Sequence, residues 1–308
     1  MSESPAVSLR QSRRDRLSAH LSPDGAYRTV VVIAPVTVRE GSRLHGLNPL
    51  TTVLLGEALL AALLDAGLAT QHARSHLQWK CAGPVKGISA EATTMGEVRG
   101  FVERPAATVD AASGPEMLAE AVGLGVLRVV RIRSELREPS QSSTALMHSR
   151  TARDMADFYA QSDQIPTAMR IEVDLDPALE VDRALGILIQ RVPDTAEPSH
   201  ERVVELEERL RSLDVRGLPR EPIVAIEQIL DQLFGPQVAT ELRTSQVDFF
   251  CPCSAKYYES KLITLGVEEL RSMAADGPQS ITCHYCARTY EYSSERLNDL
   301  AVEALRQN

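Results

Sequence analysis

The chain has 308 residues, of which 44% are hydrophobic and 24% charged, and its formal net charge is −9 at pH 7. This composition is typical of a folded soluble protein, and the length allows two or three domains. The negative charge argues against a general nucleic-acid binder, because phosphate binding needs a concentrated positive field.

Residues 1–26 are polar and are expected to form a lead-in with a short helix. An arginine pair in this stretch is not followed by the apolar run that an export signal needs, so we expect a cytoplasmic protein. The most apolar segment, residues 50–68, is interrupted by Glu57 and Asp65. A membrane span would not place two carboxylates there without partners, so we expect a buried helix and no membrane association.

Strand-like segments, interspersed with a few helices, occupy the chain as far as Pro193. The first is Tyr27–Val38, and Asn48-Pro49 then gives a start signal for the apolar helix. A second helix is expected at about Ser149–Ser162. Further strands are expected at Leu77–Cys81, Val85–Ala90, Glu97–Val102, Val126–Ile132, Met169–Leu175 and Gly186–Val192. This mixture of strands and helices predicts an α+β core domain over residues 1–193.

The composition changes after this domain, and residues 194–245 are expected to be a charged helical linker. More than half of the residues from 201 to 216 are charged, and a second helix is expected from Pro222 to just before Gly235. Along the first helix, apolar residues recur at steps of three and four and form one narrow seam: Val203, Leu206, Leu210 and Leu213. Short helices with thin apolar stripes are marginal in water, so this linker is predicted to be ordered only while docked. A permanently solvated linker remains the alternative.

Four of the five cysteines gather near the C-terminus, as a C-x-C pair, Cys251 and Cys253, and a C-x-x-C pair, Cys283 and Cys286. In a reducing compartment such a cluster favours a metal site over structural disulfides. Four thiolates complete a tetrahedral shell around zinc, with Zn–S distances of about 2.3 Å. We therefore expect one zinc ion per chain in a small module over residues 246–308.

The C-x-C pair bears on whether this zinc module is static. Structural zinc knuckles usually have about two to four residues between their cysteines. A C-x-C disulfide closes a small strained ring, and strained disulfides are typically labile or regulatory. The pair therefore indicates a site that can lose zinc to an oxidant, although a static structural zinc module remains an alternative.

A family resemblance follows from these strings. C-P-C-S, L-I-T-L-G-V-E-E-L and C-H-Y-C-A-R-T-Y-E-Y resemble the bacterial redox-regulated heat-shock chaperone family called the 33 kDa chaperonin. Upstream, Asn48-Pro49-Leu50 with Leu55-Gly56-Glu57, Gly83-Pro84 with residues 96–101, and Tyr159–Pro166 also resemble family motifs. Three places depart from the family pattern: Ala184-Leu185-Gly186 stands where a Gly-Gly pair is usual, residues 140–149 are polar, and Asp163 replaces a glutamate.

The resemblance implies an ATP-independent holdase chaperone, not an enzyme. It implies that Cys251, Cys253, Cys283 and Cys286 bind zinc when reduced, and that oxidation pairs neighbouring cysteines and releases the metal. The C-terminal module and the linker then unfold and expose a surface that captures unfolding client proteins, which are the expected partners. Whether oxidised chains also pair as homodimers is left open.

Two other functions fit the sequence less well. A zinc-ribbon nucleic-acid module is disfavoured, because residues 246–308 carry six basic and nine acidic side chains. A thiol–disulfide oxidoreductase normally places C-x-x-C at a helix start, whereas here strand-like residues follow the pair.

Two remaining residues could be mistaken for parts of a site. Cys81 lies alone in an alternating strand pattern and is expected to be a core residue. His284 lies between two cysteines and is expected to be exposed and not a ligand, because four thiolates already satisfy the ion.

Overall fold

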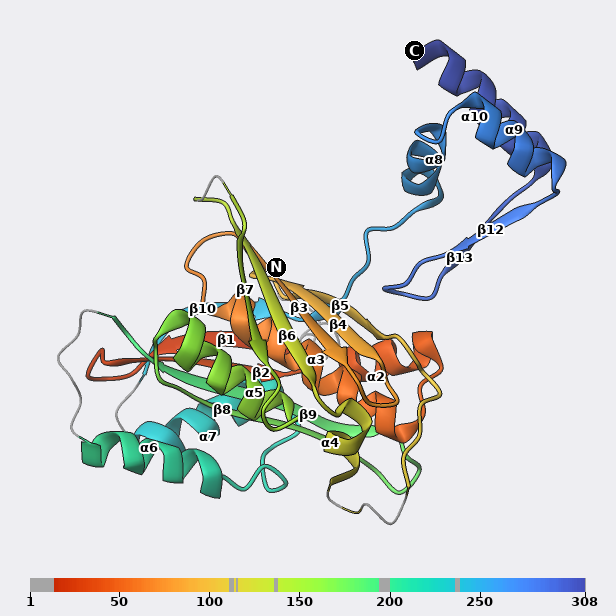
Figure 1. The fold of residues 1–308 in the computed structure, drawn as a ribbon. Coiled ribbons are helices and arrows are strands. Elements are labelled where there is room, and N and C mark those ends of the chain that lie inside the picture. The colour runs from red at the N-terminus through yellow and green to blue at the C-terminus, as the bar shows by residue number, and fades with distance from the viewer. Residues whose placement is uncertain are drawn as a thin grey trace, which may run out of the picture. The chain divides into compact units, whose positions relative to one another are not determined.

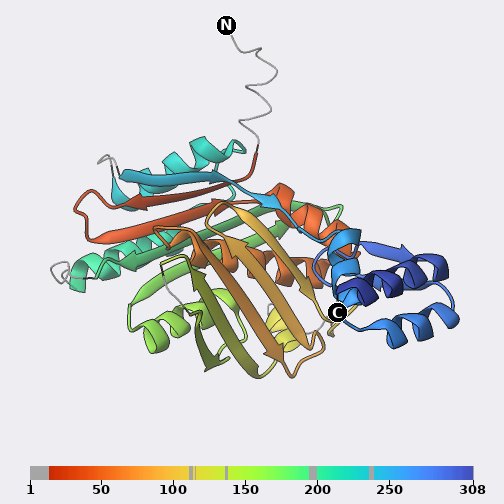
Figure 2. The same ribbon diagram turned by 90° about the horizontal axis from the view of Figure 1, so that it is seen from above.

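The computed structural model describes residues 14–110, 114, 116–135, 138–193, 200–235 and 239–307. The chain divides into two compact units, residues 1–250 and residues 251–308. The first unit contains two β-sheets with a long helix between them (Figures 1 and 2). The predicted α+β class, with a separate C-terminal module that carries the cysteine cluster, is confirmed.

The first sheet has five strands in the order β10-β1-β2-β9-β8, and all neighbouring pairs are antiparallel. Its members are β1 (Arg16–Leu21), β2 (Tyr27–Ile33), β8 (Thr167–Leu175), β9 (Val181–Arg191) and β10 (Thr240–Gln246). Alternate side chains of β2 and β9 are buried on opposite faces of this sheet, so both faces are covered.

The second sheet has six strands in the order β11-β5-β4-β3-β6-β7. Only the short strand β11 pairs in parallel, with β5. The members are β3 (Ala73–Cys81), β4 (Gly87–Thr93), β5 (Glu97–Val102), β6 (Gly125–Arg133), β7 (Ser140–Ala145) and β11 (Asp248–Phe249). Strands β10 and β11 are consecutive in the chain but belong to different sheets.

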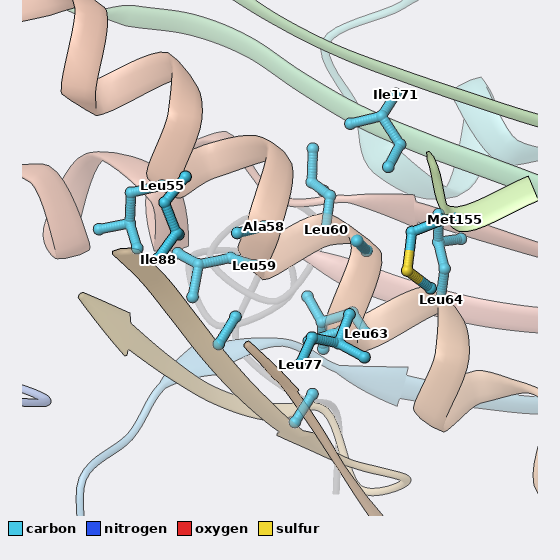
Figure 3. Close-up of a cluster of buried hydrophobic side chains, with 14 of the residues drawn as sticks. Leu55, Ala58, Leu59, Leu60, Leu63, Leu64, Leu77, Ile88, Met155 and Ile171 are labelled. Atoms are coloured by element: carbon cyan, nitrogen blue, oxygen red, sulfur yellow. The ribbon is translucent and has the colours of Figure 1, made fainter. Parts of the chain in front are cut away.

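Helix α3 (Pro49–Gly67) lies between the two sheets and forms the centre of the core. Asn48 caps its start by accepting a hydrogen bond from the Thr51 N–H, and Pro49 occupies the first turn, where it is tolerated. Figure 3 shows its leucines directed to both sides, toward Leu77 and Ile88 on one and toward Ile171 on the other. The helix is long and apolar enough to cross a membrane, but 83% of its apolar window is buried inside the unit. It is therefore the buried core helix that the sequence predicted.

Asp65, one of the two carboxylates inside this helix, is paired. It accepts hydrogen bonds from Arg131 at 2.6 Å, from the Tyr159 hydroxyl at 2.7 Å and from Ser75. Arg131 also pairs with Asp163 at 2.8 Å, so it joins both carboxylates. Burial alone would raise the pKa of Asp65, but the Arg131 charge and these hydrogen bonds hold it below its ordinary value.

The described part of the first unit contains further helical elements. They are α2 (Pro35–His45), α4 (Met117–Val122), α5 (Thr151–Phe158), the π-helical turn η2 (Tyr159–Asp163), α6 (His200–Ser212) and α7 (Pro222–Phe234). Helices α6 and α7 lie on the side of the first sheet that faces away from α3 (Figure 1). Residues 200–234, which contain both of these helices, are called the linker below.

The C-terminal unit has a small core of its own. Its elements are α8 (Ala255–Ile263), α9 (Val267–Ala275), β12 (Gln279–Thr282), β13 (Thr289–Tyr292) and α10 (Ser294–Gln307). Eight buried side chains form the core, among them Leu262, Leu270, Tyr292, Leu297 and Leu300. Strands β12 and β13 form a two-stranded hairpin, which is marginal alone and depends on packing against other elements.

The structure corrects three of the predicted elements. Residues 16–21 form strand β1 and not part of a helix, whereas residues 1–13 lie outside the described residues. The strand expected at Tyr27–Val38 ends at Ile33, because Pro35 begins helix α2. Residues 240–245, expected within a helical linker, belong to strand β10 (Thr240–Gln246), which pairs with β1.

Candidate metal centre and the covered sheet face

The four clustered cysteines lie in two separate segments of the C-terminal unit, one irregular and one a hairpin turn. Cys251 and Cys253 precede α8, whose start is capped by Ser254, which accepts a hydrogen bond from the Tyr257 N–H at 3.1 Å. Cys283 and Cys286 lie in the turn between β12 and β13. This turn places the C-x-x-C pair in a β-hairpin and not at a helix start, unlike the arrangement of a thiol–disulfide oxidoreductase.

Local backbone bonds shape the hairpin turn. The Cys283 N–H donates to the Arg288 carbonyl at 2.9 Å, and the Ala287 N–H donates to the Cys283 carbonyl at 2.8 Å. Ala287 adopts a left-handed conformation with φ of 56°, which a small side chain tolerates better than a β-branched one. The turn therefore holds the sulfur atoms of both cysteines of this pair close together.

The sulfur atoms of all four cysteines lie within 4.8 Å of one another. The Sγ atoms of Cys251 and Cys283 are 3.7 Å apart, and those of Cys253 and Cys286 are 3.3 Å apart. All four are free thiols. A tetrahedral zinc ion with Zn–S bonds of about 2.3 Å separates its sulfurs by about 3.8 Å. The residues that the sequence singled out thus come together in a group that fits a zinc ion.

Hydrogen bonds bias the protonation of these thiols. Burial alone would raise the pKa of Cys283, but donors from the Tyr258 hydroxyl and from the Cys286 and Tyr285 N–H groups bring it to about 7. Burial raises the pKa of Cys286 above its ordinary value, even though the Arg288 N–H donates to its sulfur. These surroundings favour ionisation of Cys283 over that of Cys286, and a bound cation would favour ionisation of all four thiols.

Two tyrosines donate hydrogen bonds to sulfurs of the cluster. The Tyr290 hydroxyl donates to the Cys253 Sγ at 3.2 Å, and its ring lies 5.2 Å from the ring of Tyr258. From the sequence alone, neither tyrosine was assigned to the site. Strand alternation could not have placed Tyr290 there, because Cys286 lies in the turn and β13 begins only at Thr289.

We predict that Tyr290→Phe weakens zinc binding without changing the fold. The substitution removes the hydroxyl that donates to Cys253 but keeps the ring that packs on Tyr258. Hydrogen-bonding partners of metal ligands typically contribute about 10- to 100-fold to affinity, so a loss of about tenfold is expected. Competition with a chromogenic chelator measures it, with Tyr257→Phe, an exposed tyrosine of α8, as the control. Equal affinities of the two variants would remove Tyr290 from the site.

The structure places the other two residues as the sequence predicted. Cys81 is buried in β3, inside the core of the first unit, and burial raises the pKa of its thiol to about 12. Its side chain is therefore a core residue and a poor nucleophile. His284 is exposed and does not belong to the group of possible metal ligands.

The apolar seam of the linker is docked against the first sheet. Leu206, Leu210 and Leu213 are only 2%, 4% and 3% exposed, whereas Val203 is half-buried beside a hollow between α6 and the sheet. Helix α7 adds Ile226, Ile229 and Leu233 to the same cluster. The sheet residues beneath are Tyr27, Val31, Leu185, Ile187 and Ile189, which we call the covered sheet face.

Comparison with known proteins extends the resemblance over nearly the whole chain. The family model described as "Hsp33 protein" matches residues 15–293. A 33 kDa chaperonin of Pelobacter propionicus is 30% identical over 292 residues, 94% of this chain and 95% of the relative. The 33 kDa chaperonin of Synechococcus elongatus is 33% identical over 290 residues, 93% of this chain and 97% of the relative.

A solved structure agrees with the sequence relatives. The crystal structure of the 33 kDa chaperonin from Thermotoga maritima superposes with a TM-score of 0.82 at 28% sequence identity. The match covers 95% of this chain and 99% of the other. With its two sheets around α3 and its cluster of four cysteines, the chain belongs to the Hsp33 family of chaperones.

Proposed function

We propose that this chaperone is a redox-regulated, ATP-independent holdase of the cytoplasm. The observation that carries the proposal is the cluster of four free thiols. These sulfurs can hold one metal ion or form two disulfides, but they cannot do both. In the reduced state the four thiolates would bind one zinc ion, which contributes folding energy to the C-terminal unit. The linker then covers the sheet face, and the reduced protein is inactive.

Oxidation would join Cys251 to Cys253 and Cys283 to Cys286. Each pair gives up two electrons and two protons to one equivalent of peroxide, which leaves as two water molecules. In the closed cluster the two shortest contacts run across the pairs, from Cys251 to Cys283 and from Cys253 to Cys286. Once the unit loosens, these distances no longer hold. A disulfide between neighbouring cysteines then closes a shorter loop than one across the pairs, and a shorter loop costs less entropy to close. The pairing is therefore assigned by loop length.

Loss of the thiolates would unfold the C-terminal unit. Among its described residues, eight buried side chains form the core, and domains of this size commonly need a metal or disulfide framework for stability. Residues 239–250 connect this unit to the linker, and they pair with both sheets through β10 and β11. We propose that unfolding of the unit loosens this segment and then the linker, because short helices are marginal without docking.

Release of the linker would expose an apolar surface to clients. The covered sheet face and the inner sides of α6 and α7 are buried together in one cluster, so both become accessible when they separate. Exposed apolar patches of this kind bind other apolar surfaces without a nucleotide. The net charge of −9 would keep a complex with an unfolding protein soluble.

Zinc content and client protection, measured together, test the proposal. The reduced protein should contain one zinc per chain and fail to suppress the aggregation of a heat-denatured client in light scattering. Peroxide at elevated temperature should remove zinc and produce suppression in the same sample, and a thiol reductant with added zinc should reverse both. Peptide mapping that found mainly disulfides to Cys81, with zinc still bound, would contradict the switch.

A further inference from the structure

The C-terminal end of helix α6 is held by an arginine of the first sheet. Nη1 of Arg170, on strand β8, donates to the carbonyl of Leu210 at 2.8 Å, to that of Arg211 at 3.1 Å and to that of Leu213 at 2.8 Å. The last carbonyls of a helix have no partner within the helix. A cation at this end also interacts favourably with the helix dipole. Arg170 thus supplies both a donor and a charge to the end of the linker helix.

A neighbouring carboxylate fixes the direction of this side chain. Glu172 accepts from Arg170 Nε at 2.7 Å and from its Nη2 at 2.5 Å, which leaves Nη1 directed at α6. The Arg170 side chain is only 20% exposed, so these bonds are largely shielded from water. Hydrogen bonds from a charged donor in such surroundings are stronger than those between neutral groups.

The next strand continues the same contact along the linker. Nη2 of Arg183, on β9, donates to the carbonyl of Arg216 at 2.7 Å and to that of Leu218 at 3.0 Å. Arg220 of the linker forms an ion pair with the Asp182 carboxylate of β9 at 2.6 Å. The turn between α6 and α7 is therefore tied to the sheet by arginine side chains, in addition to the apolar seam.

The basic residues of α6 do not replace this contact. Nη1 of Arg209, in the last turn of the helix, donates to the Leu233 carbonyl of α7, and its Nη2 pairs with Glu205. Arg170 donates to carbonyls of two residues in the last turn of α6, and to the residue that follows the helix. These three bonds join a core strand to the linker, so they exist only while the linker is docked.

We propose that Arg170, oriented by Glu172, is a latch that positions α6 on the sheet and sets how readily the linker opens. This inference rests on the proposed function, in which opening of the linker exposes the client surface. If Arg170 only stabilised the core, replacing it would loosen both sheets and α3 together. The latch acts on residues 200–234 alone.

Hydrogen exchange of the reduced, zinc-loaded full chain separates the two roles. In Arg170→Met, which keeps the aliphatic part of the side chain, amides of residues 200–221 should exchange about tenfold faster or more. One hydrogen bond from a charged group corresponds to roughly this factor. Zinc content and the exchange of residues 251–307 and of α3 should stay unchanged. Arg170→Lys, which keeps the charge with fewer donors, should restore part of the protection.

Arg216→Met is the matched control, because the side chain of this linker arginine is 84% exposed and contacts Asp174 at 3.7 Å. It should leave exchange in α6 unchanged. Glu172→Gln should give a smaller rise over the same amides, and it keeps the test available if Arg170→Met does not fold.

Unchanged exchange in α6 of the Arg170 and Glu172 variants, or a rise spread equally over α3 and both sheets, would overturn the latch. If α6 opens in Arg170→Met but the reduced variant does not hold clients, the latch stands and the proposed client surface fails.

Discussion

Cys283→Ser is expected to lower zinc affinity by more than about 100-fold, beyond the 10- to 100-fold effect of a partner outside the ligand set. The cluster then lacks one of its four sulfurs, and a hydroxyl is a poor replacement for a thiolate on zinc. The C-terminal unit should lose its folded structure because its small core depends on the metal. Helix α3 and the strands packed on it should stay folded, since this core lies within the first unit. Residues 239–250 and the linker should loosen, as in the proposed switch.

Zinc stoichiometry and hydrogen exchange measure both effects. Cys81→Ser is the control, because Cys81 lies in the core of the first unit, and this variant should keep one zinc per chain. The double variant Cys251→Ser/Cys283→Ser removes one sulfur from each pair and should bind no zinc at equimolar metal. Full zinc retention by the double variant would show that the four cysteines are not the site.

Leu206→Glu is expected to open the linker without oxidation. Leu206 is 2% exposed and packs in the cluster over the covered sheet face, so a carboxylate there must either leave the sheet or lose its charge. Truncating a buried leucine alone costs about 2–5 kcal/mol, which corresponds to a shift of about 30-fold or more in the docking equilibrium. The reduced, zinc-loaded variant should therefore suppress client aggregation with little or no peroxide.

Val204→Glu is the matched control for this variant. Val204 lies on the same helix but is 45% exposed, so a carboxylate there stays in water. Its activation by peroxide should equal that of the unaltered chain. If both variants behave like the unaltered chain, docking of α6 does not limit activity and the apolar seam is not part of the switch.

The parts of the fold that local patterns encode could be predicted from the sequence. The apolar run after Asn48-Pro49 forms the core helix, because such a segment must be buried on all sides. The cysteines of each pair are close in sequence, and all four sulfurs come together within one small unit. The seam Leu206, Leu210 and Leu213 could be recognised by its helical spacing and is buried.

The parts that depend on pairing between distant residues could not be predicted. Strand β10 lies at a sheet edge and is ordered by pairing with β1, which is more than two hundred residues earlier in the chain. Its mostly polar sequence carries only a weak strand signal. The contact of Arg170 with the end of α6 is likewise absent from any local pattern.

Close packing favours a glycine at Gly186 of strand β9. A Cβ on Gly186 would lie 2.9 Å from the Leu64 side chain, where β9 approaches α3. Ala184 is 1% exposed, so a single methyl group is accommodated in the core at that position.

The most direct test of the account measures linker opening and client binding in one sample. Protein oxidised at elevated temperature is mixed with a heat-denatured client, and light scattering is recorded beside hydrogen exchange over residues 200–234 and 251–307. The account predicts that both segments lose protection as suppression of aggregation appears, while α3 stays protected. Oxidised protein that protects the client while residues 200–234 remain as protected as in the reduced form would contradict the linker mechanism.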